Sequence, residues 1–176
     1  CLGAGRGVSL PALSTASSEM NYRMVGAYAR IRRQFNTEVG KFEGVQEATA
    51  EIAATGYTLE AMRQFVAKGL ETGAPSVMTA MAKYHATELM RKSVEHSMDV
   101  VGGRAIQKGP RNFLVASYHS VPVAITVEGA NILTRSLMIF GQGAMRCHPF
   151  LFEEMQAMQL ENPAEGLKKF DKLFTA

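Results

Sequence analysis

Residues 125–149, ITVEGANILTRSLMIFGQGAMRCHP, place one acidic residue, Glu128, where an apolar stretch turns into a predicted helix. Apolar residues recur after it at three- and four-residue spacing, which is the period of an amphipathic helix. Thr126 is a suitable N-cap, and the glycines Gly141 and Gly143 are expected to end the helix. Glu128 is therefore predicted to lie in the first helical turn.

An acidic residue at this position has two explanations. It can complement the helix dipole, which contributes about 0.3–1 kcal/mol. Alternatively, apolar neighbours desolvate the carboxylate and increase its basicity, while Gly129 leaves it accessible on one side. A carboxylate of the second kind can remove a proton from carbon.

The segment VEGANIL at 127–133 resembles the YEGT-[N/Q]-x-I signature of the acyl-CoA dehydrogenases, whose Glu is the catalytic base. Over 125–149 the sequence is similar to the bacterial long-chain members of this family, which act in fatty-acid β-oxidation. Two positions depart from the common pattern. Val127 replaces an aromatic residue, and Ala130 replaces a Thr whose hydroxyl usually contacts the flavin.

The resemblance implies a set of site residues spread along the chain. Glu128 would be the catalytic base, and the acyl-CoA substrate would contact Arg6 and Gly129. The residues implied at the cofactor, FAD, are Arg32, Gln34, Phe42, Glu43, Asp99, Gly102, Gly103, Ala130 and Asn131. No metal site is implied.

Two further motifs support this set. YARIRRQF at 28–35 resembles the family's YAxxRxxFG, in which the Arg contacts FAD, often that of a neighbouring subunit. Arg32 matches it, and a guanidinium can bind two pyrophosphate oxygens, although basic residues there also complement a helix C-terminus. Glu43 stands where relatives have a Gln and lacks the donors of an amide.

DVVGG at 99–103 matches the family's Q-x-x-GG, where the backbone approaches the diphosphate of the cofactor. A Cβ would collide at such an approach, so glycine is required. A Gly-Gly pair is also common at the end of a helix without any ligand. Both interpretations remain open from the sequence.

Helical periodicity predicts an all-α antiparallel four-helix bundle with short extra C-terminal helices. The lead-in 1–9 is expected to be flexible or truncated, and 104–122 is expected to be a loop with at most one short helix between the breakers Gly109-Pro110 and Pro122. The helices are predicted at 11–35, 42–72, 75–101, 127–141 and 150–160, with a last one from Asn162-Pro163. Residues 1–150 would form the C-terminal bundle domain of an acyl-CoA dehydrogenase, and 151–176 the start of a C-terminal extension.

The composition is that of a globular protein, with 176 residues, 47% hydrophobic residues and 20% charged residues. A net charge of +3 with scattered basic residues does not indicate nucleic-acid binding. Two cysteines cannot form a disulfide framework, and no signal peptide is recognised. A bacterial cytoplasmic location is expected, with peripheral contact at the inner membrane as an alternative. The chain resembles part of a longer enzyme with further N-terminal domains.

The resemblance implies FAD-dependent dehydrogenation of fatty acyl-CoA to trans-2-enoyl-CoA, with electron-transfer flavoprotein as the electron acceptor. A homo-oligomer, dimer or tetramer, is also implied. One alternative is a helical oligomerisation module without activity of its own, and another is a related acyl-CoA oxidase. The 176-residue chain alone is expected to fold but neither to retain FAD nor to turn over.

Overall fold

The computed structural model describes residues 2–73 and 76–175. Its internal contacts divide the chain into two compact units, one up to Asn131 and one from Ile132 onward. Each unit is described separately below. The predicted domain boundary at residue 150 stays a prediction.

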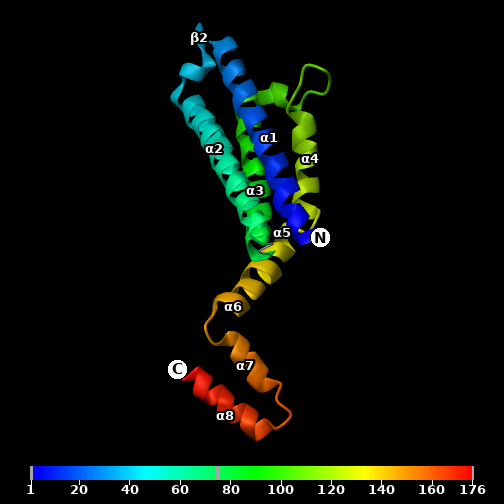
Figure 1. Cartoon of the computed structure of the whole chain (residues 1–176). Coiled ribbons are helices and arrows are strands. Elements are labelled where there is room, and N and C mark those ends of the chain that lie inside the picture. Colours follow the sequence, from blue (N-terminus) through cyan, green and yellow to red (C-terminus); the bar gives the residue numbers. More distant parts are fainter. Residues whose placement is uncertain (1, 74–75, 176) are drawn as a thin grey trace. The chain divides into compact units, whose positions relative to one another are not determined.

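Three long helices and one shorter helix form the first unit (Figure 1). They are α1 (Leu2–Ile31), α2 (Glu43–Glu71), α3 (Ser76–Val101) and α4 (Val115–Thr126). Helix α1 packs against both α2 and α3, and α4 packs against α3. The all-α bundle is therefore confirmed. The predicted helix start at Pro75 lies outside the described residues.

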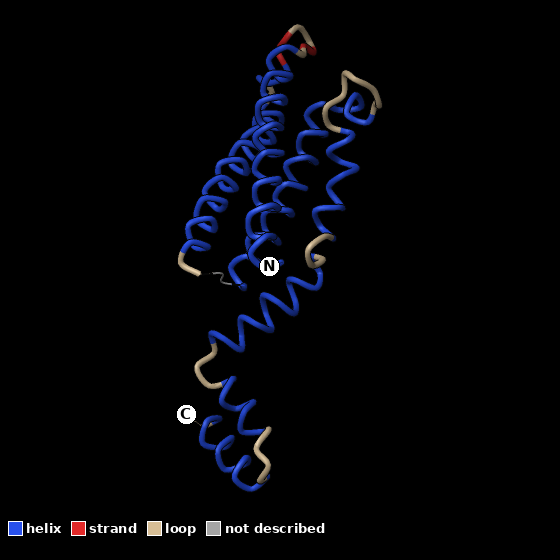
Figure 2. Tube along the Cα trace, turned by 45° about the vertical axis from the view of Figure 1, so that its right-hand side comes forward, coloured by secondary structure: helices blue, strands red, loops and turns tan. Residues whose placement is uncertain are grey.

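A short antiparallel hairpin connects α1 to α2 and contains the strands drawn in red in Figure 2. Strand β1 (Arg33–Gln34) pairs with β2 (Thr37–Glu38), and a single 3-10 turn, η1 (Val39–Lys41), follows. Phe35 and Asn36 between the strands have φ values of 50° and 62°. A two-residue hairpin loop of type I′ requires positive φ at both positions. The predicted helix to Phe35 therefore ends four residues early, at Ile31.

Helix α1 begins at Leu2, so the prediction of a flexible lead-in before Pro11 was wrong. Pro11 lies buried inside the helix, where it lacks the amide donor of an ordinary residue. Gly7 is used for packing: a Cβ there would lie 2.5 Å from Cγ2 of Thr79 on α3. The absence of a side chain at Gly7 therefore allows α1 to approach α3 closely.

The core of the first unit combines aliphatic and small polar side chains. Val25 of α1 and Val94 of α3 have no exposed surface. Between α1 and α3, the amide of Asn21 donates a hydrogen bond of 3.2 Å to Oγ of Ser93. The aliphatic residues that α2 buries are Ile52, Leu59 and Val66, which form a seam at helical spacing.

Helix α4 differs from its prediction. The chain leaves α3 through a 3-10 helix, η2 (Gly102–Ile106), and then forms α4, which continues through Pro122 to Thr126. Pro122 was predicted to interrupt helical structure. However, Val121 and Ala124 on either side of it are buried against α3, in a cluster with Met90 and Val94. This burial outweighs the loss of one backbone hydrogen bond at proline. Thr126 therefore ends a helix and does not cap the next one.

The second unit begins within a helical segment that was predicted to end at Gly141 and Gly143. Instead α5 (Asn131–Leu133) continues into a π-helix, η3 (Thr134–Gly141), and then into α6 (Gln142–Cys147). Helix α6 ends where His148 adopts an extended ψ of 129°. The residue before a proline, here Pro149, is disfavoured in the helical region, which explains the end point.

Two short helices complete the second unit. Helix α7 (Leu151–Met158) is preceded by His148, whose Nδ1 accepts a hydrogen bond of 3.1 Å from the amide of Leu151. Helix α8 (Pro163–Phe174) begins as predicted, because Oδ1 of Asn162 accepts a hydrogen bond from the amide of Ala164. His148 thus caps the start of α7.

Within the described residues, no helix by itself has the length and hydropathy of a membrane span. The bent pair of Val115–Thr126 and Asn131–Cys147 meets these two criteria only when both members are taken together.

Candidate functional site

Glu128 lies in the break between α4 and α5 and not in a first helical turn. The last residue before it, Val127, is extended with ψ 157°, and Glu128 itself has φ 52°. A non-glycine residue in this left-handed region costs roughly 1–2 kcal/mol relative to the right-handed one. Gly129 follows with φ 98°, which glycine adopts readily. The helix-dipole explanation for Glu128 therefore does not apply.

The Glu128 side chain is exposed in this chain. The hydroxyl of Ser9, on α1, donates a hydrogen bond of 3.5 Å to its Oε2. The apolar shielding expected from the sequence is thus not provided by the described residues. An exposed carboxylate on a strained backbone is typical of a site residue, because such strain persists where surrounding structure holds it.

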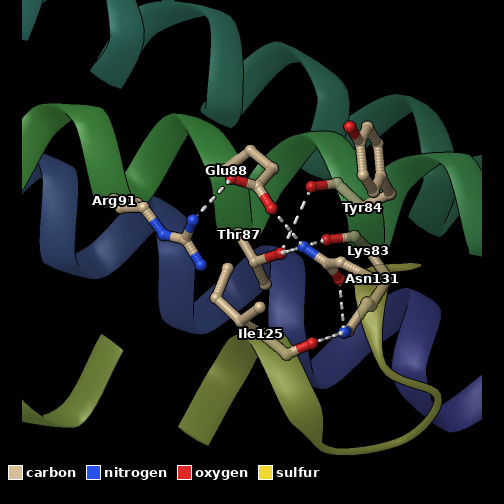
Figure 3. Close-up of polar contacts among 7 residues, drawn as sticks. All are labelled: Lys83, Tyr84, Thr87, Glu88, Arg91, Ile125 and Asn131. Atoms are coloured by element: carbon tan, nitrogen blue, oxygen red, sulfur yellow. Dashed lines mark hydrogen bonds and ion pairs between the residues drawn. The ribbon is translucent and has the colours of Figure 1, made fainter. Parts of the chain in front are cut away.

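Lys83 of α3 holds the chain on both sides of Glu128, and Figure 3 shows its contacts with Ile125 and Asn131. Its Nζ donates to the carbonyl of Ile125 at 3.0 Å and to the carbonyl of Gly129 at 2.9 Å. A third hydrogen bond, of 2.6 Å, reaches Oδ1 of Asn131. The Lys83 side chain has no exposed surface. The three donors of the ammonium thus match three acceptors around the break.

Asn131, the first residue of α5, follows the break directly and is 3% exposed. Its Nδ2 donates to Oγ1 of Thr87 at 3.0 Å and to Oε1 of Glu88 at 2.8 Å, as Figure 3 shows. Both amide donors are therefore used inside the protein. The Asn131 side chain thus supports the break from inside the protein, and its contact with FAD stays a prediction.

Arg6 is a second buried cation near Glu128. It lies within α1, not ahead of it, is 4% exposed, and donates from Nη2 to the carbonyl of Ser76 at 3.3 Å. Burial lowers the pKa of the Arg6 guanidinium, and the Glu128 carboxylate opposes this effect. Burial also lowers the pKa of the Lys83 ammonium, and the positive charge of Arg6 lowers it further. Arg6 and Lys83 thus place two basic side chains in the interior near Glu128.

An apolar groove of about 530 Å³ runs next to this break. It lies mainly between α1 and α4, and Val127, adjacent to Glu128, is one of its lining residues. The other apolar residues that line it are Leu10, Leu13, Ala16, Met20, Met90, Val121, Val123 and Ala124. A groove with such a lining favours a hydrocarbon ligand.

Apart from Ala130, the remaining predicted residues lie at the opposite end of the bundle. Arg32 follows the end of α1, whereas Arg6 is near its start, a separation of about 39 Å along the helix axis. Figure 1 shows the hairpin, the start of α2 and the end of α3 together at this far end. The exposed residues there are Arg32, Gln34, Phe42, Glu43, Asp99, Gly102 and Gly103. The structure therefore separates the predicted site residues into two clusters.

The far cluster leaves room for a group next to the Gly-Gly pair. Gly102 has φ 70°, so its own backbone conformation already requires glycine. No described atom lies within 4 Å of a Cβ built on Gly103, so packing against this chain does not explain that residue. The residues present therefore fit a bound diphosphate, with the Arg32 guanidinium exposed at the same end.

Ala130, the other residue of the break, is partly buried between Gly129 and Asn131. The sequence analysis did not identify Lys83 or Ser9 as site residues. A signal for Lys83 existed, because it shares the buried face of α3 with Thr79, Ala86 and Met90 at helical spacing. A lysine on such a face needs buried acceptors.

Comparisons with known proteins identify similar sequences along most of the chain. The family model "Acyl-CoA dehydrogenase, C-terminal domain" matches residues 6–139, and "Acyl-CoA dehydrogenase, C-terminal, bacterial type" matches 145–176. The chain is 32% identical over 104 residues to the short/branched chain specific acyl-CoA dehydrogenase, mitochondrial, of Bos taurus, covering 58% of this chain and 24% of that protein. With the probable acyl-CoA dehydrogenase FadE10 of Mycobacterium tuberculosis it shares 26% identity over 133 residues, 74% of this chain and 20% of that protein.

Solved structures show the same fold. An acyl-CoA dehydrogenase from Geobacillus kaustophilus matches with a TM-score of 0.69 and 22% identity, covering 80% of this chain and 36% of that one. Butyryl-CoA dehydrogenase from Megasphaera elsdenii matches with a TM-score of 0.69 and 22% identity, covering 82% of this chain and 37% of that one. The chain thus spans no more than 24% of the length of the curated relatives named above.

Proposed function

This chain belongs to the acyl-CoA dehydrogenase family, and we propose that the full-length protein converts fatty acyl-CoA to trans-2-enoyl-CoA with Glu128 as the base. The observation that carries the proposal is the exposed Glu128 carboxylate on a left-handed residue next to an apolar groove. The carboxylate takes the α-proton, which thioester conjugation acidifies. FAD, when bound, would supply the acceptor for the β-hydride, and loss of the α-proton and the β-hydride together gives the α,β double bond.

The groove next to Val127 supports a fatty acyl chain as the ligand. Its lining of aliphatic and methionine side chains would bury the hydrocarbon, at about 0.8 kcal/mol per CH₂. Methionine adapts to ligands of different shape, and Met20 and Met90 both line the groove. Substrates of the long-chain class are therefore proposed. In this arrangement Glu128 lies at the end of the groove where the thioester would be.

The separation of about 39 Å between the two clusters supports an oligomer. The break would contact the FAD and the acyl-CoA of one active site, and Arg32, Gly102 and Gly103 would contact the FAD of a neighbouring subunit. This division follows the family motif, whose Arg often reaches the cofactor of another subunit. We further propose that the protein is a homo-oligomer in the bacterial cytoplasm and that electron-transfer flavoprotein is its electron acceptor. Residues 151–176 are proposed to begin a C-terminal extension.

The proposal is tested on the full-length protein that carries this chain. Under anaerobic conditions, a long-chain acyl-CoA should bleach the visible flavin band, and mass spectrometry should detect the 2-enoyl-CoA product. If FAD is bound but no acyl-CoA of any chain length bleaches it, the proposed reaction is wrong. Stoichiometric peroxide formation in air would instead identify an oxidase.

Gly103→Ala should weaken FAD binding while leaving the fold intact. The added methyl meets no described atom, but it would occupy the space next to the backbone where a diphosphate approaches. We expect the dissociation constant for FAD to rise about tenfold, which corresponds to about 1.4 kcal/mol. Gly26→Ala on α1, which also has open space around its Cβ, is the matched control. Equal FAD affinity for wild type and Gly103→Ala, measured by fluorescence titration of the apoprotein, contradicts the assignment.

A further inference from the structure

Lys83 is a fully buried cation that donates hydrogen bonds to the residues around the break between α4 and α5. Its three hydrogen bonds of 2.6–3.0 Å end on Asn131 and on the carbonyls of Ile125 and Gly129. Burying an ammonium is costly unless it is hydrogen-bonded on all sides. Its place in the structure therefore depends on the acceptors that the break provides.

The two carbonyl acceptors lie on opposite sides of Glu128. Ile125 belongs to the last turn of α4, whose final carbonyls lack partners within the helix. Gly129 follows Glu128 directly. One ammonium thus ties the chain before the base to the chain after it. The path of residues 126–128 between these two anchors is fixed accordingly.

A second layer of contacts holds the third acceptor in place. Asn131 donates to Thr87 and Glu88, and Glu88 pairs with Arg91 at 3.4 Å. Oγ1 of Thr87 in turn donates to the carbonyl of Lys83 at 2.9 Å. Figure 3 shows that Lys83, Thr87, Glu88 and Arg91 all belong to α3, with the first three contacting Asn131 and Arg91 paired with Glu88. One rigid helix therefore carries the whole support.

We propose that Lys83 is a positioning residue that holds Glu128 at the geometry needed for proton removal. This proposal rests on the proposed function, in which Glu128 is the base. The left-handed φ of 52° at Glu128 is unfavourable for a residue with a side chain. The hydrogen bonds from Lys83 to the two carbonyls offset this backbone strain. They also prevent the backbone from adopting another conformation in which the Glu128 carboxylate would point elsewhere.

The test compares Lys83→Met with Lys92→Met in the full-length holoenzyme. Methionine keeps much of the buried length but removes the charge and the three donors, while Lys92 is an exposed lysine on the same helix. Flavin reduction by acyl-CoA is measured in single turnover and expressed per bound FAD. We expect Lys83→Met to lower the reduction rate constant about tenfold to a hundredfold, because small displacements of a base have effects of this size. Lys92→Met should match the wild type.

Expressing the rate per bound FAD separates positioning from stability. If Lys83 only stabilises the fold, the molecules that retain FAD reduce at the wild-type rate, and the proposal is overturned. If Lys83 positions the base, the rate constant falls while the substrate dissociation constant changes by less than about threefold. Should Lys83→Met fail to accumulate, Asn131→Leu removes one acceptor of Lys83 and should give a smaller fall of the same kind.

Glu128→Gln distinguishes the two levels of the proposal. If Glu128→Gln abolishes reduction while Lys83→Met leaves it unchanged, the base assignment stands and the positioning role fails. If Glu128→Gln reduces at the wild-type rate, the base assignment itself fails, and with it the role of Lys83.

Discussion

Replacing Glu128 by Gln in the full-length protein should lower the rate constant of flavin reduction by acyl-CoA about 10²–10⁴-fold, the usual contribution of a general base. Glutamine keeps the size of the side chain and can still accept the hydrogen bond from Ser9, but it cannot take up the α-proton. FAD content and acyl-CoA affinity should stay close to those of the wild type. The measurement is anaerobic stopped-flow spectroscopy of the visible flavin band.

Glu128→Asn provides the matched control for stability. Asparagine tolerates the left-handed region better than most residues, and Glu128 has φ 52°. The variant should therefore be inactive but at least as stable as the wild type. Such a result is expected for a site residue kept at a cost in stability. A clear loss of stability in Glu128→Asn, with reduction at the wild-type rate, would indicate a structural role instead.

Gly7→Ala should destabilise the packing of α1 on α3 by about 1–3 kcal/mol, the range for overpacked cores. The new Cβ would lie 2.5 Å from Cγ2 and 2.8 Å from Cβ of Thr79. Thr79 is fully buried, and its hydroxyl donates to the carbonyl of Ser76 at 3.0 Å, so its side chain is held in place. The measurement is the free energy of amide hydrogen exchange in α1 and α3 of the full-length protein.

Gly5→Ala is the control, since it lies in the same turn of α1 with no described atom within 4 Å of its Cβ. Alanine favours a helix over glycine by roughly 0.5–1 kcal/mol, so this variant should be slightly more stable. Opposite signs for the two substitutions would identify the contact with Thr79 as the cause. Equal protection of α1 and α3 in both variants would contradict the packing described for Gly7.

Where the predicted elements were right, the signals were strong and local. The seam of α2 follows helical spacing, and Asn162-Pro163 combines a capping side chain with a proline in the first turn of α8. Such signals depend on residues close to one another in the sequence. For these helices the structure therefore adds little beyond the residues at which each helix begins and ends.

Where the predictions failed, tertiary packing outweighed a local signal. Pro11 and Pro122 both lie inside helices, although each removes a backbone donor. Their neighbours are buried against α3, and that burial compensates for the lost bonds. The strength of such contacts depends on residues far away in the sequence: Gly7 and Thr79 are 72 positions apart, and Val121 and Val94 are 27 positions apart. A scan of local patterns cannot include them.

The sequence by itself determined the all-helical class, the family resemblance and the choice of Glu128, because these depend on spacing and on a contiguous motif. Only the tertiary structure decided that Glu128 lies in a break and that Lys83 of α3 anchors the chain on both sides of it. The reason is physical: a buried ammonium takes its position from acceptors that folding brings together, and those acceptors lie 42–48 residues farther along the chain.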